Sequence, residues 1–470
     1  MPKASKKKIL FYNWIQFDEP NNLGGGVNVY QKNLIEELIK ENKYEIYFLS
    51  SGVRYDILRK KTYIEKTKNC FGDKCKSFRI VNSACTAPMS SMYENIDTFL
   101  TDDTTYETLK NFIKEQNGFD IIHFNNIEGL SSKCLEIKKD FPKTKTIYSL
   151  HNYLCFTPQV NMFYLCENAD SKEIVKKPNQ KNTIRFYKLD SKLRKLKCSN
   201  LSTKILSKAK KIANGNVKTT QQTICIDNKD IARYCDQNVG RINEYIDIVL
   251  AVSERTREIG IKHGIDENKI HTEYIGTAFA EKAKYKLHEK EPNPYFTIAY
   301  MGYFEKVKGF NFLINALKKL PNDVAKRVDF VCYARIKSDS DKELASEVIK
   351  LNKHLHSAKH FNGYSHEELG EIMKDADLGI VPVIWEDNLP QVAIEYAAHG
   401  VPVLASNLGG AHELSKCKEF VFKANDEKDF LNKLNNIILD RNLANKYFEN
   451  MIHLNTLRDY IDKLEGYYDK

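Results

Sequence analysis

Two acidic residues in the second half of the chain, Asp387 and Glu395, combine a residue type and a spacing that suit ligand binding. Asp387 lies in a polar loop after a predicted strand, and the helix that begins near Pro390 places Glu395 about one and a half turns from its start. The two carboxylates could therefore hold different hydroxyl groups of one ligand. Taken singly, a carboxylate in such a place is more often a helix-dipole partner or a surface charge.

A glycine-bounded loop, residues 302–309, carries two lysines to the end of another predicted strand. Open α/β sheets bind ligands where their parallel strands end. Lys308 in this loop could therefore meet a diphosphate. The alternative is an exposed turn lysine, which is common on protein surfaces.

Two further glycine clusters could bring backbone N–H groups close to an anion. Gly25 and Gly26 open a predicted helix after the first strand, and Gly409 and Gly410 follow the predicted strand 401–405. We expect the N–H groups of the second pair to be free. For the first pair, a simple turn that joins a strand to a helix remains an alternative.

Two histidines, His123 and His151, stand at the ends of predicted strands in the first half of the chain. No cysteine or carboxylate lies at a metal-ligand spacing from either residue, so the sequence predicts no zinc site. Either ring could hydrogen-bond a polar ligand or be a satisfied structural histidine. We assign the ligand-binding role to His151 and the structural role to His123.

Short runs rich in β-branched and aromatic residues alternate with segments of helical periodicity, which is typical of parallel sheets with crossover helices. The predicted strands are 9–12, 45–49, 121–124, 146–150 and 248–252 in the first half, and 297–301, 329–333, 378–382 and 401–405 in the second. At 470 residues the chain exceeds the size of one hydrophobic core, so we expect two α/β domains.

Composition also suggests where the domains divide. Residues 281–294 are rich in lysine and glutamate and end in two prolines, as a linker would. We expect an N-terminal domain over 1–285 with a basic helical insertion at about 167–245, a C-terminal domain over 286–445, and a C-terminal helix over 446–470 that returns to the N-terminal domain. The helical pattern behind this last element runs from about Leu443 to Tyr468.

The formal charge of +10 is concentrated in one segment. Residues 171–220 hold 15 lysines and arginines against two acidic residues. Such a segment attracts phosphate-bearing partners or an anionic membrane surface, whereas the scarcity of interleaved aromatic residues argues against nucleic acid. A basic amphipathic helix packed on the first domain is the alternative.

The eleven cysteines show no paired metal-ligand spacing, so we expect reduced thiols in the cytoplasm. The most apolar runs fall far short of the ~20 residues that span a bilayer. The apolar run behind the N-terminal lysines is too short for a signal-peptide core. A cytoplasmic protein is therefore expected, and peripheral binding to the inner face of the membrane through the basic segment remains open.

Taken in this order, the segments resemble the retaining glycosyltransferases of family 4, of the bacterial cell-surface glycan type. Asp387 and Glu395, with the Ala-Ala-His-Gly-Val-Pro-Val of residues 397–403, are similar to that family's E-x7-E motif and its A-x-A-x-G-x-P-V continuation. The resemblance implies the GT-B fold, an α/β architecture of two facing Rossmann-like domains with parallel sheets and a C-terminal helix crossing back to the first domain.

The resemblance also implies roles for the candidate residues. Glu395 would hold the ribose of a nucleotide, Asp387 would meet hydroxyls of the donor sugar, and Lys308 would neutralise the diphosphate leaving group. Gly25 and Gly26 would approach the phosphates, and His151 would hydrogen-bond the sugar. The donor pocket would be lined by Gly302, Tyr303, Asn388, Leu389, Pro390, Gln391, Gly409 and Gly410. No metal or other cofactor is implied.

Three positions depart from the family pattern. Asp387 and Tyr303 stand where the family usually has glutamate and arginine, and residues 332–334 replace a glycine pair. Asp387 keeps the negative charge with a shorter reach. Tyr303 removes a bidentate phosphate partner and leaves the cationic role to Lys308, alone or with Lys306 or Arg335.

The expected reaction is transfer of a hexosyl group from a UDP- or GDP-sugar to a glycan or lipid-linked acceptor, with retention of configuration, in polysaccharide biosynthesis. Two alternatives remain open. The altered positions 303 and 332–334 motivate a catalytically silent GT-B subunit that binds or stabilises a partner. A nucleotide-sugar epimerase would release free nucleotide without transfer.

Overall fold

The computed structural model describes residues 6–19, 24–56, 58–88, 96–158, 228–283, 285–289 and 293–469. The basic segment 171–220, with its expected membrane contact, and most of the predicted insertion at 167–245 lie outside these residues. The chain forms two compact units. The N-terminal unit contains Met1–Ala251, Ile259–His271 and Leu464–Lys470, and the C-terminal unit contains Val252–Glu258 and Thr272–Lys463.

The N-terminal unit is built on an eight-stranded sheet with the order β3-β4-β2-β1-β5-β6-β7-β8. Its strands are β1 (Lys7–Tyr12), β2 (Tyr44–Ser50), β3 (Tyr63–Thr67), β4 (Cys75–Val81), β5 (Ile121–Phe124), β6 (Lys145–Leu150), β7 (Ile248–Ala251) and β8 (Ile270–Thr272). The central strands pair in parallel, and β3 runs antiparallel to β4 at one edge. β5 is buried along its whole length, as parallel strands covered on both faces are.

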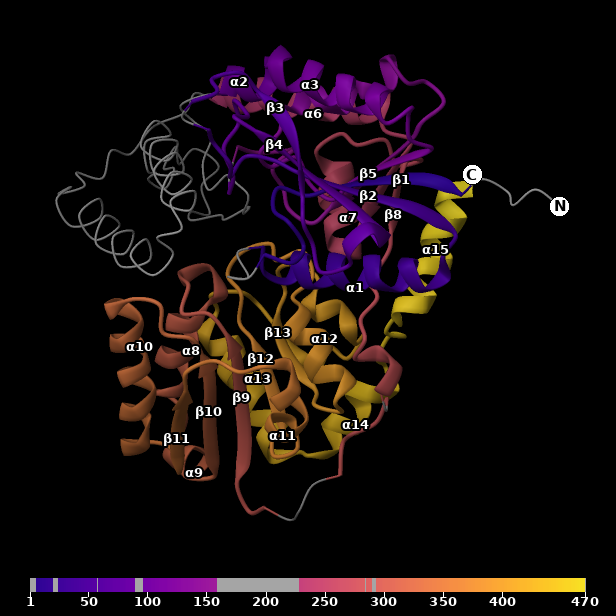
Figure 1. The fold of residues 1–470 in the computed structure, drawn as a ribbon. Coiled ribbons are helices and arrows are strands. Elements are labelled where there is room, and N and C mark those ends of the chain that lie inside the picture. Colours follow the sequence, from indigo (N-terminus) through magenta and orange to yellow (C-terminus); the bar gives the residue numbers. More distant parts are fainter. Residues whose placement is uncertain are drawn as a thin grey trace. The chain divides into compact units, whose positions relative to one another are not determined.

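Helices cover both faces of this sheet. Figure 1 shows α2 (Ile96–Thr101), α3 (Asp103–Glu115) and α6 (Asn228–Tyr245) together over one face, with α1 (Gly25–Glu41) across the other. Apolar residues of α2, α3 and α6 and of the strands form one continuous core. The start of α3 is fixed by the Asp102 side chain, which accepts the N–H groups of Thr104 and Thr105.

The C-terminal unit is built on a six-stranded, fully parallel sheet with the order β11-β10-β9-β12-β13-β14. Its strands are β9 (Phe296–Gly302), β10 (Val328–Ala334), β11 (Ser357–Phe361), β12 (Leu378–Val381), β13 (Val403–Ser406) and β14 (Val421–Phe422). The helices are α8 (Phe310–Leu317), α9 (Asn322–Ala325), α10 (Asp339–Lys350), α11 (Leu369–Met373), α12 (Gln391–Ala398), α13 (Glu427–Leu439) and α14 (Asn442–Glu449). Strand β9 lies where the strand order reverses, which is the usual binding edge of an open α/β sheet.

Two helices join the units along the chain. The first residues of α7 (Glu254–Lys262) belong to the C-terminal unit and its last residues to the N-terminal unit. Helix α15 (Leu457–Asp469) ends in the N-terminal unit, where Tyr468 contacts His123 and Lys7 pairs with Asp469 at 2.6 Å, so the expected return of the chain is confirmed (Figure 1).

One predicted helix is wrong in its extent. The sequence pattern suggests a continuous helix over 443–468, whereas the structure has α14 and α15 with an interruption between them. Met451 forms an antiparallel bridge with Ser415, and the flanking backbone groups of Asn450 and Ile452 bond to Lys416 and Leu414. These sheet-like contacts need extended backbone and end the helix.

All nine predicted strands are confirmed, and their ends differ from the predicted ones by at most two residues. The prediction missed β3, β4, β8, β11 and β14, which are short or carry charged residues. Part of the suggested linker packs against the C-terminal unit, because both ring nitrogens of buried His288 contact the backbone carbonyls of Gly400 and Lys374. In the described part of the chain, no helix combines the length and apolarity needed to cross a membrane.

Candidate functional site

The best-defined candidate site lies at the ends of β9 and β12, where Lys308 meets Asp387. The chain leaves β9 at Gly302 and forms the short helix η4 (Lys306–Lys308) before α8 begins. The ammonium nitrogen of Lys308 lies 2.6 Å from Oδ2 of Asp387. The side chain of Asp387 is 11% exposed and that of Lys308 27% exposed, so the pair is largely withdrawn from solvent without being fully buried.

Gly309 is the residue that allows this approach. Its φ of +72° is a left-handed conformation, and a Cβ there would lie 1.6 Å from the carbonyl oxygen of Pro382. The loop after β9 therefore packs directly on the end of β12. Lys308 also lies beside the ring of Trp385, with its nitrogen 5.4 Å from the ring centroid.

The backbone of Gly409 and Gly410 is hydrogen-bonded to the loop that carries Asp387. The N–H of Gly409 donates to Oε2 of Glu386, and the N–H of Gly410 donates to the carbonyl oxygen of Asp387, both at 2.9 Å. A Cβ at Gly409 would lie 1.9 Å from that carbonyl oxygen. The expectation of free N–H groups at this pair is therefore wrong, because both groups bond within the chain.

Glu386 and Arg255 form a second ion pair that the sequence analysis missed. The guanidinium of Arg255 donates through Nε at 3.0 Å and through Nη2 at 2.5 Å to the two carboxylate oxygens of Glu386, whose side chain is 2% exposed. The contact with Glu386 raises the pKa of Arg255. Because Arg255 lies at the start of α7, far from Glu386 in sequence, no local pattern predicts the pair.

Glu413 anchors the same end of α7. Its carboxylate accepts the backbone N–H groups of Glu254 and Arg255 at 2.8 and 2.7 Å, and the hydroxyl of Tyr274 at 2.7 Å. An acidic group at a helix N-terminus satisfies donors that the helix leaves unpaired. Burial raises the pKa of Glu413 above its ordinary value. Glu413 is thus a structural support for the Asp387 loop.

Helix α12 carries Glu395, the second residue of the acidic pair. Tyr396 fixes the helix against the sheet, because its hydroxyl donates to the carbonyl of Ala299 at 3.0 Å and its ring covers Gly379. Glu395 is 3% exposed. Tyr364 donates its hydroxyl to Oε2 of Glu395 at 3.3 Å, so the carboxylate is partnered within the chain.

The remaining donor-pocket candidates of the C-terminal unit lie on the loops that carry Lys308 and Asp387 and at the start of α12. Asn388 and Leu389 are buried, and Pro390 is the extended residue before α12, whose first residue is the half-buried Gln391. Tyr303 is 37% exposed, and the ammonium of Lys337 lies 4.0 Å from its ring centroid. Tyr303, which stands where the family that the sequence resembles usually has arginine, therefore has a cation over its ring.

The other candidates lie in the N-terminal unit. Gly25, with a φ of +56°, and Gly26 form the first residues of α1, so their expected place at a helix start is confirmed. His151 follows β6, and its ring lies 5.0 Å from that of Tyr30. Burial lowers the pKa of His151 to about 4, and its Nε2 has no hydrogen-bond partner among the described residues.

His123 has the structural role expected for it. Its Nδ1 lies 3.0 Å from the hydroxyl of Tyr468 and its Nε2 lies 2.8 Å from Oγ of Ser149. Burial lowers the pKa of His123 to about 3, so the ring is neutral. Among the described residues, no group of three or more histidine, cysteine, aspartate and glutamate side chains is arranged to hold a metal ion.

Comparison with solved structures defines the class of fold. Three solved structures are similar to this chain, and each alignment covers 99% of it. A glycosyltransferase from Rickettsia africae matches with 16% identity and a TM-score of 0.59 over 99% of its own chain. Sucrose-phosphate synthase from Thermosynechococcus elongatus matches with 15% identity and a TM-score of 0.58 over 98% of its chain, and HepE from Anabaena in complex with UDP and glucose with 14% identity and a TM-score of 0.56 over 100% of its chain. With its two parallel-sheet α/β units, the chain has the GT-B fold.

Sequence comparison gives a second, narrower finding. Residues 281–453, most of the C-terminal unit, match the family described as "Glycosyl transferases group 1". Over 173 residues the chain is 27% identical to an uncharacterized 41.2 kDa protein in the cps region of Klebsiella pneumoniae, a match that covers 36% of this chain and 45% of that protein. The family match and the fold together support a glycosyltransferase.

Proposed function

We propose that this protein transfers a glycosyl group from a nucleotide sugar to a glycan or lipid-linked acceptor. The observation that carries the proposal is the Lys308–Asp387 pair at the binding edge of the C-terminal sheet, with Glu395 on the helix that follows the Asp387 loop. A cation and two carboxylates at one edge suit a ligand that has both phosphates and hydroxyl groups.

The chemistry needs a group that takes up negative charge. When the bond between the sugar and the diphosphate breaks, the electron pair leaves with the phosphate oxygen. The ammonium of Lys308 stabilises that charge. Lys337, which lies between β10 and α10, adds a second cation over the ring of Tyr303. The carboxylate of Asp387 accepts hydrogen bonds from sugar hydroxyls, and Glu395 accepts them from the ribose.

The finer parts of the proposal extend the family resemblance. We place the protein in family 4, with retention of configuration by attack of the acceptor on the same face from which the diphosphate leaves. Lys308 takes the cationic role without a metal ion. From the N-terminal unit, the backbone at Gly25 and Gly26 approaches the phosphates, and His151 hydrogen-bonds the sugar. Support for the His151 role is its buried, unpartnered Nε2 within the described residues.

The donor is proposed to be a UDP- or GDP-sugar. The structure of HepE from Anabaena in complex with UDP-glucose shows that a protein of similar fold binds a nucleotide sugar, which supports this choice. Polysaccharide biosynthesis is proposed as the setting, in line with the cps region named for the Klebsiella pneumoniae relative.

A thermal-shift screen with UDP, GDP, CMP and their sugars tests the proposal, because a ligand that binds only the folded state raises the melting temperature. We expect one nucleotide family to raise it, and Glu395→Ala to remove the shift. Binding without release of free nucleotide would favour a silent subunit, and release of nucleotide with an epimerised sugar would favour an epimerase. Absence of any shift would contradict the proposal.

A further inference from the structure

Glu395 has two side-chain neighbours that the proposed function leaves unexplained. Tyr364 donates to Oε2 at 3.3 Å, and Nε2 of His366 lies 3.5 Å from Oε1. Tyr364 precedes the short helix η6 (His366–Glu368), which follows β11, whereas Glu395 lies on α12. The segment after β11 therefore contacts both carboxylate oxygens of Glu395, one through Tyr364 and the other through His366.

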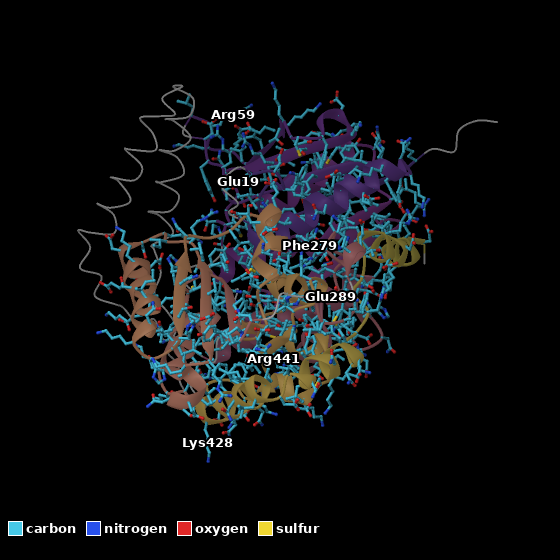
Figure 2. The ribbon with its side chains drawn as sticks, turned by 90° about the horizontal axis from the view of Figure 1, so that it is seen from below. Glu19, Arg59, Phe279, Glu289, Lys428 and Arg441 are labelled. Atoms are coloured by element: carbon cyan, nitrogen blue, oxygen red, sulfur yellow. The ribbon has the colours of Figure 1, made fainter. Side chains whose placement is uncertain are left out.

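The two sides of the His366–Glu395 contact differ in exposure. The side chain of Glu395 is 4% exposed, whereas that of His366 is 47% exposed. Phe279, labelled in Figure 2, lies with its ring centroid 5.6 Å from that of His366 in an edge-on contact and 5.8 Å from that of His399. The imidazole is thus held by Glu395 and Phe279 while nearly half of it stays in contact with solvent.

The charge of His366 responds to one carboxylate. The contact with Glu395 raises the pKa of His366 above its ordinary value. The other acidic residues on its own short helix, Glu367 and Glu368, are exposed, and Glu368 caps the helix by accepting the N–H of Ser365 at 2.7 Å. The imidazolium form therefore strengthens the grip on Glu395 specifically.

These contacts leave the carboxylate only partly occupied. A carboxylate offers about four acceptor positions, and Tyr364 and His366 together address two of them. The remaining positions can accept two hydroxyl groups at once, but only if the plane of the carboxylate is fixed. A glutamate side chain with several rotatable bonds needs such partners to hold that plane.

We propose that His366 is a positioning residue that orients Glu395 toward the vicinal diol of a ribose, and that this arrangement makes the protein discriminate ribonucleotides from 2′-deoxyribonucleotides. The inference rests on the proposed function, because it assumes that Glu395 binds the nucleotide. A site built to receive a hydroxyl rejects an analogue without it, since its buried polar groups are left unpaired.

Isothermal titration of the full chain with UDP and 2′-deoxy-UDP, and with GDP and 2′-deoxy-GDP, tests the inference at pH 6 and pH 8.5. We expect the unmodified protein to bind the ribonucleotide at least tenfold more tightly, and the ratio to fall at pH 8.5 as His366 loses its charge. His366→Ala should lower the ratio at least fivefold. His366→Gln keeps an N–H donor without titrating, so it should restore most of the ratio and make it independent of pH.

The control is His356→Ala. His356 also pairs with a carboxylate of the C-terminal unit, with Nδ1 2.7 Å from Oδ1 of Asp329, and its side chain is 38% exposed. We expect this variant to keep the ratio and its pH dependence. If His366→Ala binds ribonucleotide but keeps the full ratio, the inference fails while the proposed function stands. If the unmodified protein binds none of the four nucleotides, both fail.

Discussion

The ammonium nitrogen of Lys308 lies 2.6 Å from Oδ2 of Asp387, so the cation assigned to the leaving group is paired with the carboxylate assigned to the donor sugar. Without a ligand each group compensates the charge of the other in a partly buried setting. A bound diphosphate would have to share Lys308 with Asp387, which would leave Asp387 oxygens available to sugar hydroxyls. Sugar and phosphate binding are therefore expected to depend on each other.

Lys308→Gln should slow release of nucleoside diphosphate from the donor by about 100-fold or more, because the variant lacks the charge that stabilises the departing phosphates. The rate of nucleotide release under saturating donor measures this effect. Lys306→Gln, on the same short helix and exposed, is the control and should stay within about threefold of the unmodified rate. Equal losses in both variants would mean that Lys308 has no special role.

Gly309→Ala should destabilise the C-terminal unit, because the new methyl group would collide with the carbonyl of Pro382 at a left-handed backbone position. The expected loss is about 2 kcal/mol or more. Gly370→Ala is the matched control. Gly370 lies in α11 with open space at its Cβ, so this change should stabilise the protein by about 0.5–1 kcal/mol. Thermal unfolding would show opposite shifts, and two shifts of the same sign would contradict this account.

Arg255→Ala should lower the unfolding free energy by about 2 kcal/mol, since it leaves the buried carboxylate of Glu386 without its cation. This loss is smaller than the ~3–5 kcal/mol typical of breaking a fully buried ion pair, because the Arg255 side chain is 36% exposed. The double variant Arg255→Ala/Glu386→Gln should recover much of the lost unfolding free energy, because it leaves no unpaired charge buried. Chemical denaturation of Arg255→Ala, of Glu386→Gln and of the double variant measures the coupling, and simple additivity would rule out a direct pair.

Stability of the N-terminal unit should fall as pH drops below about 6.5. The pKa of His123 is lowered to about 3 and that of His151 to about 4, so in this range the unfolded chain binds protons that the folded chain does not. Each such histidine contributes about 1.4 kcal/mol per pH unit. His123→Gln should therefore cost stability at pH 7 but lose less on acidification.

Urea denaturation midpoints at pH 7, 6 and 5 test this expectation for His123. The gap between the unmodified protein and His123→Gln should narrow steadily toward pH 5. A gap that does not change with pH would show that the ring titrates similarly in the folded and unfolded chains.

The strands and much of the C-terminal site could be predicted from sequence because their signals are local. A buried parallel strand is a short apolar run, and Asp387 and Glu395 stand at a fixed spacing on one loop and the helix after it. The departures from the pattern were also visible, since Tyr303 and Asp387 are read directly from the sequence.

The groups that hold the site in place could not be predicted, because they come from distant parts of the chain. Arg255 reaches Glu386 from a helix shared by both units, and His366 reaches Glu395 from the segment after β11. The glycine pair Gly409 and Gly410 shows the same limit. Its composition suggested free N–H groups, but only the tertiary structure shows that Glu386 and Asp387 already accept them.

The most direct test of the account is the release of free nucleoside diphosphate when the full chain is incubated with a panel of UDP- and GDP-sugars. The account predicts that one sugar nucleotide gives up UDP or GDP over time, and that Asp387→Asn and Glu395→Ala slow this release at least 100-fold at a donor concentration near its Kd. Release from none of the sugars, or release at equal rates in the unmodified protein and both variants, would contradict it.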